Sequence, residues 1–228
     1  MTGAAYQPPK RSALRWAALR RMSPVVHWLW EFAVEAGAIG PTSSRGRRFG
    51  SFGAGSVICF PTNTIFNERY IRIGRDSMIG PQCTLSAGMV PGQECISDPV
   101  VSIGDRCLIG KGSGIVGHFS IEIGNDVWTG HHVYVTDQNH GYEDPTRPIS
   151  VQTMPEKAVR IGDGSWLGHG SVVLPGADIG RNVVIGANSV VTGRIPDHSV
   201  AVGAPARVVR RLVDGEWRGM TDGKPADD

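Results

Sequence analysis

The fold class that the sequence predicts is all-β, a left-handed parallel β-helix that follows a short N-terminal helical segment. The first observation is an isoleucine or leucine followed by glycine, a pair that occurs nine times between residues 73 and 186. Six of the eight successive spacings are multiples of six, and the other two, 14 and 38, are each a multiple of six plus two. The spacing therefore indicates a six-residue repeat with short insertions. The pairs are Ile73-Gly74, Ile79-Gly80, Ile103-Gly104, Ile109-Gly110, Ile123-Gly124, Ile161-Gly162, Leu167-Gly168, Ile179-Gly180 and Ile185-Gly186.

The second observation is a small or β-branched residue four positions after each aliphatic residue. A six-residue period with two inward positions fits neither a helix of period 3.6 nor a simple alternating strand. In the known class of left-handed β-helices, three such units close a triangular coil, and stacked coils bury a continuous apolar column. We expect the aliphatic residue to fill a corner and the glycine to relieve the backbone at the turn. The small residues are Ser77, Cys83, Cys107, Ser113, Val127, Ser165, Ser171, Val183 and Ser189.

The repeat divides the chain into four parts. Residues 1–10 are predicted to be a disordered tail. Residues 11–56 form a helical cap and lead-in, in which we expect Pro24 to separate two helices. Residues 57–206 form the β-helix with a long polar loop at 137–157, and residues 207–228 form a C-terminal segment and tail. The cap would close the open end of the β-helix; the alternative for this basic, tryptophan-rich helix is contact with an anionic membrane surface.

Composition limits the function classes. A chain of 228 residues, 40% of them hydrophobic, can bury one sizeable core. The net charge of +2 argues against a nucleic-acid partner. No signal peptide and no apolar run of membrane-spanning length is evident, so we expect a cytoplasmic protein, with peripheral membrane contact through the helix as the alternative. The four cysteines form no CxxC pair, which predicts no zinc site and no metal requirement.

The C-terminal half carries a more specific pattern, in three stretches: WLGHGSVVLPG at 166–176, IGANSVVT at 185–192 and GAPAR at 203–207. Together they resemble the signature of the hexapeptide-repeat acyltransferases, and the similarity spans residues 69–210. The nearest resemblance is to the maltose, galactoside and nodulation-factor O-acetyltransferases and to related polysaccharide enzymes. The resemblance implies a homotrimer that moves an acetyl group from acetyl-CoA to a hydroxyl of a sugar or a polysaccharide precursor.

The motif TDQNHG at 136–141 bears the candidate general base, His140. A hydroxyl is a poor nucleophile at neutral pH, and imidazole has a pKa suited to taking its proton as it attacks a thioester. The resemblance implies this role for His140. Either Glu143 or a backbone carbonyl would hold the ring in one tautomer. We expect Asp137, Asn139 and His118 to contact the acceptor.

The resemblance also implies the coenzyme A contacts. The pantetheine arm would run along the coils beside Trp166 and meet backbone groups at Ala187 and Thr192. A backbone N–H of Gly168 or His169 would stabilise the oxyanion. Arg207 and Arg210 match positions that meet phosphate in the family, and Arg194 replaces a lysine that relatives often carry after the threonine.

Three other readings compete with this one. A γ-class carbonic anhydrase needs two histidines five residues apart, and no pair in this sequence has that spacing. A β-helix scaffold without activity would have no reason to retain His140 together with Trp166 and Arg207. An acetyltransferase that acts on a small molecule other than a sugar shares the scaffold and the chemistry, and stays open.

Overall fold

The computed structural model describes residues 13–221 and 224–225, in two units divided between Gly37 and Ala38. The first unit contains one helix, α1 (Ala13–Gly37), and Pro24 lies inside it. The prediction of two helices is therefore wrong. Proline in a helix interior costs about 3 kcal/mol, and the helix nevertheless continues through Pro24. The tail predicted at 1–10 lies outside the described residues.

Several large apolar side chains in the described part of α1 are exposed, including Trp28, Trp30 and Phe32. Trp28 stacks on Phe32 with a centroid separation of 6.0 Å. None of the described helices combines the length and the apolar character needed to cross a membrane.

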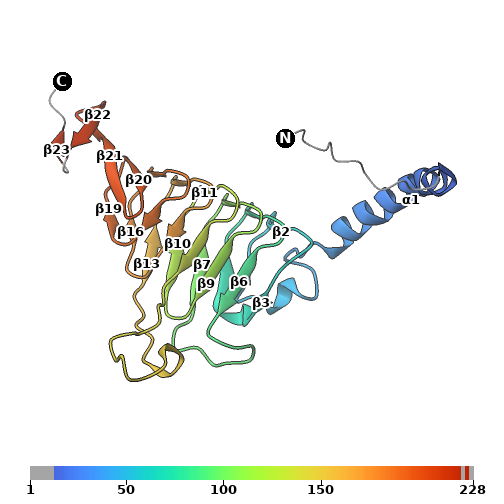
Figure 1. The fold of residues 1–228 in the computed structure, drawn as a ribbon, viewed down its shortest axis with the longest axis horizontal. Coiled ribbons are helices and arrows are strands. Elements are labelled where there is room, and N and C mark those ends of the chain that lie inside the picture. Colours follow the sequence, from blue (N-terminus) through green and yellow to red (C-terminus); the bar gives the residue numbers. More distant parts are fainter. Residues whose placement is uncertain (1–12, 222–223, 226–228) are drawn as a thin grey trace, which may run out of the picture. The chain divides into compact units, whose positions relative to one another are not determined.

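The second unit is a parallel β-helix with one N-terminal helix preceding it in the chain, which confirms the predicted fold class. Its strands form three sheets that follow one another round each coil, so that each strand pairs with its counterpart in the next coil (Figure 1). Sheet B consists of β1 (Ser51–Phe52), β4 (Ile71–Ile73), β7 (Val101–Ile103), β10 (Ile121–Ile123), β13 (Val159–Ile161), β16 (Asp178–Ile179) and β19 (Arg194–Ile195).

The other two sheets complete the coils. Sheet C runs in the order β3 (Ile65–Phe66), β6 (Thr84–Ala87), β9 (Gly114–Gly117), β12 (Tyr134–Thr136), β15 (Val172–Val173) and β18 (Val190–Val191). Sheet A runs through β2 (Val57–Ile58), β5 (Met78–Ile79), β8 (Leu108–Ile109), β11 (Trp128–Thr129), β14 (Trp166–Leu167), β17 (Val184–Ile185), β20 (Ser199–Gly203), β21 (Ala206–Val213), β22 (Glu216–Thr221) and β23 (Lys224–Pro225). The last three strands of sheet A are antiparallel, and short 3-10 helices occur at Gly46–Arg48, Glu68–Tyr70 and Ile149–Val151.

The repeat positions have the burial that the pattern predicts. Ile73, Ile103, Ile123 and Ile161 pair in register from coil to coil, and each is buried. The serines at the small position are buried as well. The hydroxyls of four of them, Ser77, Ser113, Ser165 and Ser189, bond to the next coil, as when Ser77 Oγ donates to the carbonyl of Gly104 at 2.8 Å, whereas the buried hydroxyl of Ser171 has no partner among the described residues. Cys83 and Cys107 are buried, and burial raises the pKa of both thiols, which makes them unreactive packing groups.

The repeat glycines have a different purpose from the one expected. Gly104 does not adopt a positive φ; instead, a Cβ there would lie 2.5 Å from the carbonyl oxygen of Gly124 in the next coil. The glycine therefore permits close stacking of coils. The left-handed turn conformation falls two residues later, on Arg106 in this coil and on Asp126 in the next.

Two loops interrupt the stack, after β6 and after β12, at 88–100 and 137–158. Both leave sheet C at the same edge, because each follows the carboxyl end of one of its strands, and Figure 1 shows them extending from the same side of the β-helix. The strand between them, β9, ends at Gly117 and leads directly into His118.

Candidate active site

The base of the long loop is a short antiparallel ribbon that carries His140. The N–H of Asn139 donates to Pro155 O at 3.2 Å, and the N–H of Gly141 donates to Thr153 O at 2.9 Å. Gly141 is required there, because a Cβ would lie 2.3 Å from the Thr153 carbonyl oxygen. The main chain on both sides of His140 is thus held by backbone bonds. A catalytic side chain on such a ribbon is better positioned than one on a free loop.

His140 opens onto a groove of about 540 Å³ on the outer face of sheet C. The groove lies between the two loops, with Met89 at one wall and His140 at the other, and His118 between them. None of the described residues that line it is an Asp, Glu, Lys or Arg. The remaining lining residues are Thr64, Phe66, Thr84, Ser86, Gly88, Val116, Tyr134, Thr136, Gln138, Asn139, Val172 and Leu174. Hydroxyls and aromatic rings on a neutral surface are suited to a polar, uncharged ligand.

Asp137 has a structural role that sequence reasoning did not foresee. Its side chain is fully buried, and its carboxylate accepts the N–H groups of His118 and Phe119 at 2.8 Å each and of Ser120 at 2.7 Å. Three converging N–H groups form a backbone nest that stabilises a buried negative charge. Asp137 therefore fixes the turn that holds His118, and it is not exposed to the groove.

Two other predicted site residues, Asn139 and Glu143, are both exposed. Asn139 is exposed and lines the groove, as predicted for an acceptor contact. Glu143 accepts the N–H of Tyr142 at 3.0 Å. Within the described residues no hydrogen bond joins Glu143 to His140.

Three of the predicted coenzyme A residues, Trp166, Arg207 and Arg210, lie on strands of sheet A. Trp166 pairs with Val184, Val184 with Val200, and Val200 with Arg210, so one outward row leads from Trp166 to Arg210 across successive strands. Trp166 is 52% exposed, as is expected of a residue that contacts a ligand. Trp128, which the prediction omitted, precedes Trp166 in the same row.

A β-bulge places both predicted arginines on this outer face. Residues three apart on a regular strand point to opposite sides of the sheet. Here the register between β20 and β21 shifts between Val200 and Ala201, so that Arg210 pairs with Val200 and Arg207 pairs with Val202. Since the bulge inserts one residue, both arginines face outward. Arg207 and Arg210 are both exposed.

The turn after β14 distinguishes between the two oxyanion candidates. The N–H of Gly168 already donates to Ile185 O at 2.7 Å. Among the described residues the N–H of His169 has no such partner, so it is the donor that remains available. Ala187 occupies the equivalent turn one coil later and is exposed, and Thr192 is exposed beyond β18. Arg194 lies on sheet B instead, 3.9 Å from Asp178.

Within one chain, the two halves of the predicted site stay apart. His169 lies at the edge of sheet C where its strands begin, and His140 lies beyond the edge where they end. Residues 171–174 cross the sheet between these edges, a span of about 13 Å at 3.3 Å per residue. A base and an oxyanion donor for one acyl group need to lie within a few ångströms of the reacting carbon.

Family comparison places this geometry in a known group. Residues 158–193 match the family model described as "Bacterial transferase hexapeptide (six repeats)". Residues 100–136 match the model described as "Hexapeptide repeat of succinyl-transferase". The galactoside O-acetyltransferase of Lactococcus lactis is 36% identical over 145 residues, which cover 55% of this chain and 70% of that protein. The chain belongs to the hexapeptide-repeat acetyltransferase family.

Two other relatives are also acetyltransferases by description, but this chain covers a smaller share of their length. A probable acetyltransferase of Mycobacterium tuberculosis is 38% identical over 61% of this chain and 44% of its own length. A putative lipopolysaccharide biosynthesis O-acetyl transferase of Escherichia coli is 41% identical over 40% of this chain and 50% of its own length. The chain thus spans about half the length of these two relatives. Taken together, the relatives indicate an acyltransferase.

A solved structure shares the fold. An N-acyltransferase from Bacillus cereus, determined with dTDP and coenzyme A, superimposes with a TM-score of 0.62 at 23% identity, over 73% of this chain and 87% of that one.

Two further features of this chain lie outside the groove itself. His131, His132 and His169 cluster with ring centroids 5.6 to 6.5 Å apart, although in the described residues no group of three metal-binding side chains is arranged to hold an ion. A pocket beside the loop at 88–100 is lined by Arg45, Arg48 and Arg69. The sequence held no signal for it, because Arg69 is distant from Arg45 and Arg48 in the chain and joins them only when the first coils stack.

Proposed function

We propose that this chain transfers an acetyl group from acetyl-CoA to a hydroxyl of a sugar or of a polysaccharide precursor. The observation that carries the proposal is His140, held on a backbone ribbon at the wall of a neutral groove, in a chain related to a galactoside O-acetyltransferase. The groove matches the chemistry of a sugar, which offers hydroxyls for hydrogen bonding and apolar ring faces for Phe66 and Tyr134. Because acetyl-CoA is a cytoplasmic metabolite, the proposal places the enzyme in that compartment.

The reaction follows from the residues in a single transfer. His140 accepts the proton of the acceptor hydroxyl as its oxygen attacks the thioester carbonyl carbon. The negative charge that develops on the carbonyl oxygen is stabilised by the free N–H of His169. The C–S bond then breaks, and the departing thiolate takes the proton from the His140 imidazolium. No acyl-enzyme forms, so the groove needs no nucleophilic side chain of its own.

The supporting residues have separate tasks. His118 and Asn139 line the groove and would contact the acceptor, while Asp137 holds the turn that presents His118. Glu143, through its bond to Tyr142, would hold the loop beside His140.

Coenzyme A would lie along the outward row of sheet A. Trp166 offers an apolar surface for the pantetheine arm, and exposed backbone at Ala187 and Thr192 offers hydrogen bonds. Arg207 and Arg210 stand about three strand spacings from Trp166, or about 14 Å, which suits the phosphates of an extended ligand. Arg194 lies on sheet B, where it pairs with Asp178, so we expect it to contribute least to coenzyme A binding.

We further propose a homotrimer whose active sites lie between subunits. The support is the separation of His140 from His169 across sheet C in one chain, which a neighbouring chain would close by bringing its own His169 turn against the groove. Three β-helices round a threefold axis use each such interface alike. The donor and acceptor halves of each site would then come from different chains.

Three experiments test these proposals. A panel of sugars and oligosaccharides, incubated with acetyl-CoA, should release free thiol and yield a product heavier by one acetyl group; thiol release without acceptor modification would contradict O-acetylation. Light scattering should give about three times the chain mass. Mixed trimers of His140→Ala chains and Trp166→Ala chains should recover partial activity, whereas verified mixed trimers without any recovery would place each site within one chain.

A further inference from the structure

The pocket formed by Arg45, Arg48 and Arg69 lies beside the acceptor groove. It has a volume of about 520 Å³, and residues 91–94 of the loop after β6 form one of its walls. The same loop contributes Gly88 and Met89 to the groove, and Phe66 lines both hollows. The two hollows are therefore adjacent compartments separated by one loop.

The wall between them is firmly held. Asn67 Nδ2 donates to Ala87 O at 2.6 Å and to Val90 O at 2.9 Å, and Asn67 Oδ1 accepts the N–H of Gly92 at 2.7 Å. Gln93 Oε1 accepts the N–H of Met89 at 2.7 Å. This short loop is thus anchored to the β3 turn, and both compartments have a defined shape.

The charges in the pocket are only partly balanced. Arg45 already has partners within the protein, since its guanidinium donates to Glu68 at 3.3 Å and to Ile65 O at 3.1 Å. Arg69 lies over the ring of Tyr70, 4.5 Å from its centroid. Neither Arg48 nor Arg69 has an ion-pair partner among the described residues. Glu94, the other acid lining the pocket, is exposed. Two guanidinium groups therefore remain to bind an anion.

The groove and the pocket together are long enough for more than one sugar ring. Sheet C runs from β12, which leads into His140, through β9 and β6 to β3, which borders the pocket. Three strand spacings amount to about 14 Å. A single ring in the groove would not span this distance, but a disaccharide with a charged group at its far end would.

We propose that the pocket binds an anionic group of the acceptor, so that the substrate is a saccharide with a neutral body and a phosphate or carboxylate remote from the reacting hydroxyl. The neutral groove holds the body, and Arg48 and Arg69 pair with the anion. Guanidinium groups suit both oxyanions, because their N–H groups match the oxygens of phosphate and of carboxylate. The inference rests on the proposed acetyl transfer and narrows its acceptor.

The test compares matched acceptors. Acetyl transfer is measured to maltose, to maltose 1-phosphate and to a disaccharide that ends in a uronic acid, for the wild type and for the double variant Arg48→Ala/Arg69→Ala. We expect the wild type to have a KM at least tenfold lower for one of the two anionic acceptors, and the preferred one identifies the anion. The double variant should lose this preference while its KM values for maltose and acetyl-CoA stay unchanged.

Two single variants sharpen the result. Glu94→Gln should lower KM for the anionic acceptor a few-fold, because it removes the opposing charge. Arg47→Ala should change nothing, since Arg47 lies on the same 3-10 helix as Arg48 but lines neither hollow. An equal rise in KM for neutral and anionic acceptors in the double variant, or no preference in the wild type, overturns the pocket's role while leaving acetyl transfer intact.

A binding measurement tests whether the pocket binds an anion, even if no acceptor is turned over. Calorimetry with inorganic pyrophosphate should give an affinity that falls about tenfold or more in the double variant and falls further as salt is raised. Equal affinity in both proteins would overturn the anion pocket. If no acceptor is acetylated but pyrophosphate binding depends on Arg48 and Arg69, the proposed function fails while the anion site stands.

Discussion

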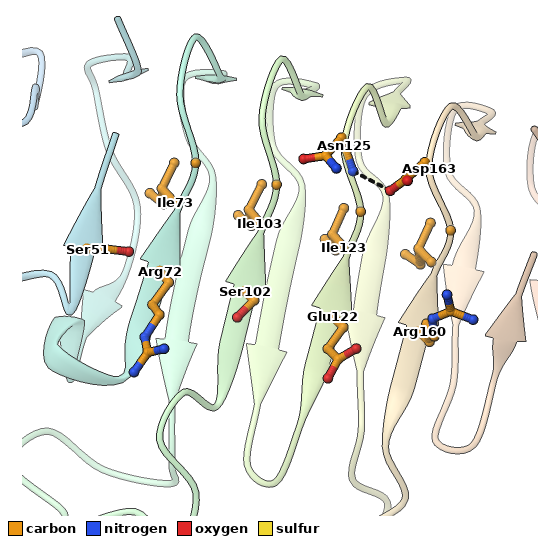
Figure 2. A pocket seen from close by; sticks show the side chains of 15 residues that line it. Ser51, Arg72, Ile73, Ser102, Ile103, Glu122, Ile123, Asn125, Arg160 and Asp163 are labelled. Carbon is orange, nitrogen blue, oxygen red and sulfur yellow. Dashed lines mark hydrogen bonds between the residues drawn. The ribbon is translucent and has the colours of Figure 1, made fainter. Parts of the chain in front are cut away.

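The outer faces of sheets B and C are built on the same repeat but carry different chemistry. Sheet B presents Arg72, Ser102, Glu122 and Arg160 in one row, with a hollow of about 470 Å³ along it (Figure 2). The hollow of sheet C is similar in size, yet none of its lining residues is an acid, a lysine or an arginine. Size therefore does not distinguish the two faces, but the placement of charge does.

The charges of sheet B compensate one another. Asp178 lies 3.8 Å from Arg160 and 3.9 Å from Arg194, and Arg72 lies 3.2 Å from Asp98 in the loop. Exposed pairs of this kind contribute about 0–1 kcal/mol each and keep the surface solvated. Sheet C lacks such pairs and has a histidine fixed at its wall. The repeat dictates the inward residues of both faces and leaves the outward ones free to differ.

The first way to test this division compares an inward residue with an outward one. Leu167 is fully buried, so Leu167→Ala should lower the free energy of unfolding by about 2–5 kcal/mol, through lost burial and the cavity left behind. Arg160→Ala, on the exposed row of sheet B, should leave it unchanged. Urea unfolding at one protein concentration measures both, because concentration affects the stability of an oligomer. A similar loss in both variants would contradict the division.

The second prediction compares the effect on catalysis of one substitution at the groove of sheet C and one in the hollow of sheet B. His140→Ala should lower kcat by about a hundredfold or more, the usual effect of losing a general base, while coenzyme A still binds. Glu122→Ala, in the hollow of sheet B, should keep full activity. Steady-state kinetics and calorimetry with coenzyme A give both values. Normal turnover in His140→Ala would remove this residue from the role of base.

The sequence predicts the fold well, because every coil repeats the same requirement for an aliphatic and a small inward residue. An irregular position in one coil therefore does not hide the six-residue period. The sequence also predicted a long polar loop that bears His140, because a polar insertion in a regular array is conspicuous, and His140 lines the groove of sheet C. It did not reveal the burial of Asp137, because the three N–H groups that bind it come from a turn one coil earlier. Likewise, it assigned Gly104 to a turn, although the glycine is needed for contact between coils, which spacing along the chain does not show.

Asp137 yields the third prediction. Asp137→Asn replaces the carboxylate by an amide that has one acceptor oxygen for three N–H groups, so we expect a loss of about 1–3 kcal/mol in stability. The turn that carries His118 should loosen, which raises KM for the acceptor more than KM for acetyl-CoA. Asp144→Asn is the matched control, since Asp144 is less buried and, among the described residues, its carboxylate accepts hydrogen bonds only from Thr146 in its own loop. Equal shifts in melting temperature for the two variants would argue against the nest.

The last and smallest prediction concerns the third face, sheet A, and the bulge in β21. Arg207→Ala should weaken coenzyme A binding about tenfold, because a charge-assisted contact with phosphate is lost. Binding of pantetheine, which lacks the phosphates, should stay the same. Arg211→Ala is the control: Arg211 pairs with Ser199, whose side chain is buried, so it belongs to the opposite side of the strand from Arg207 and Arg210. Calorimetry with the two ligands separates the outcomes. If Arg207→Ala weakens both ligands equally, its effect is structural, and if Arg211→Ala matches it for coenzyme A, the bulge does not select the face that binds phosphate.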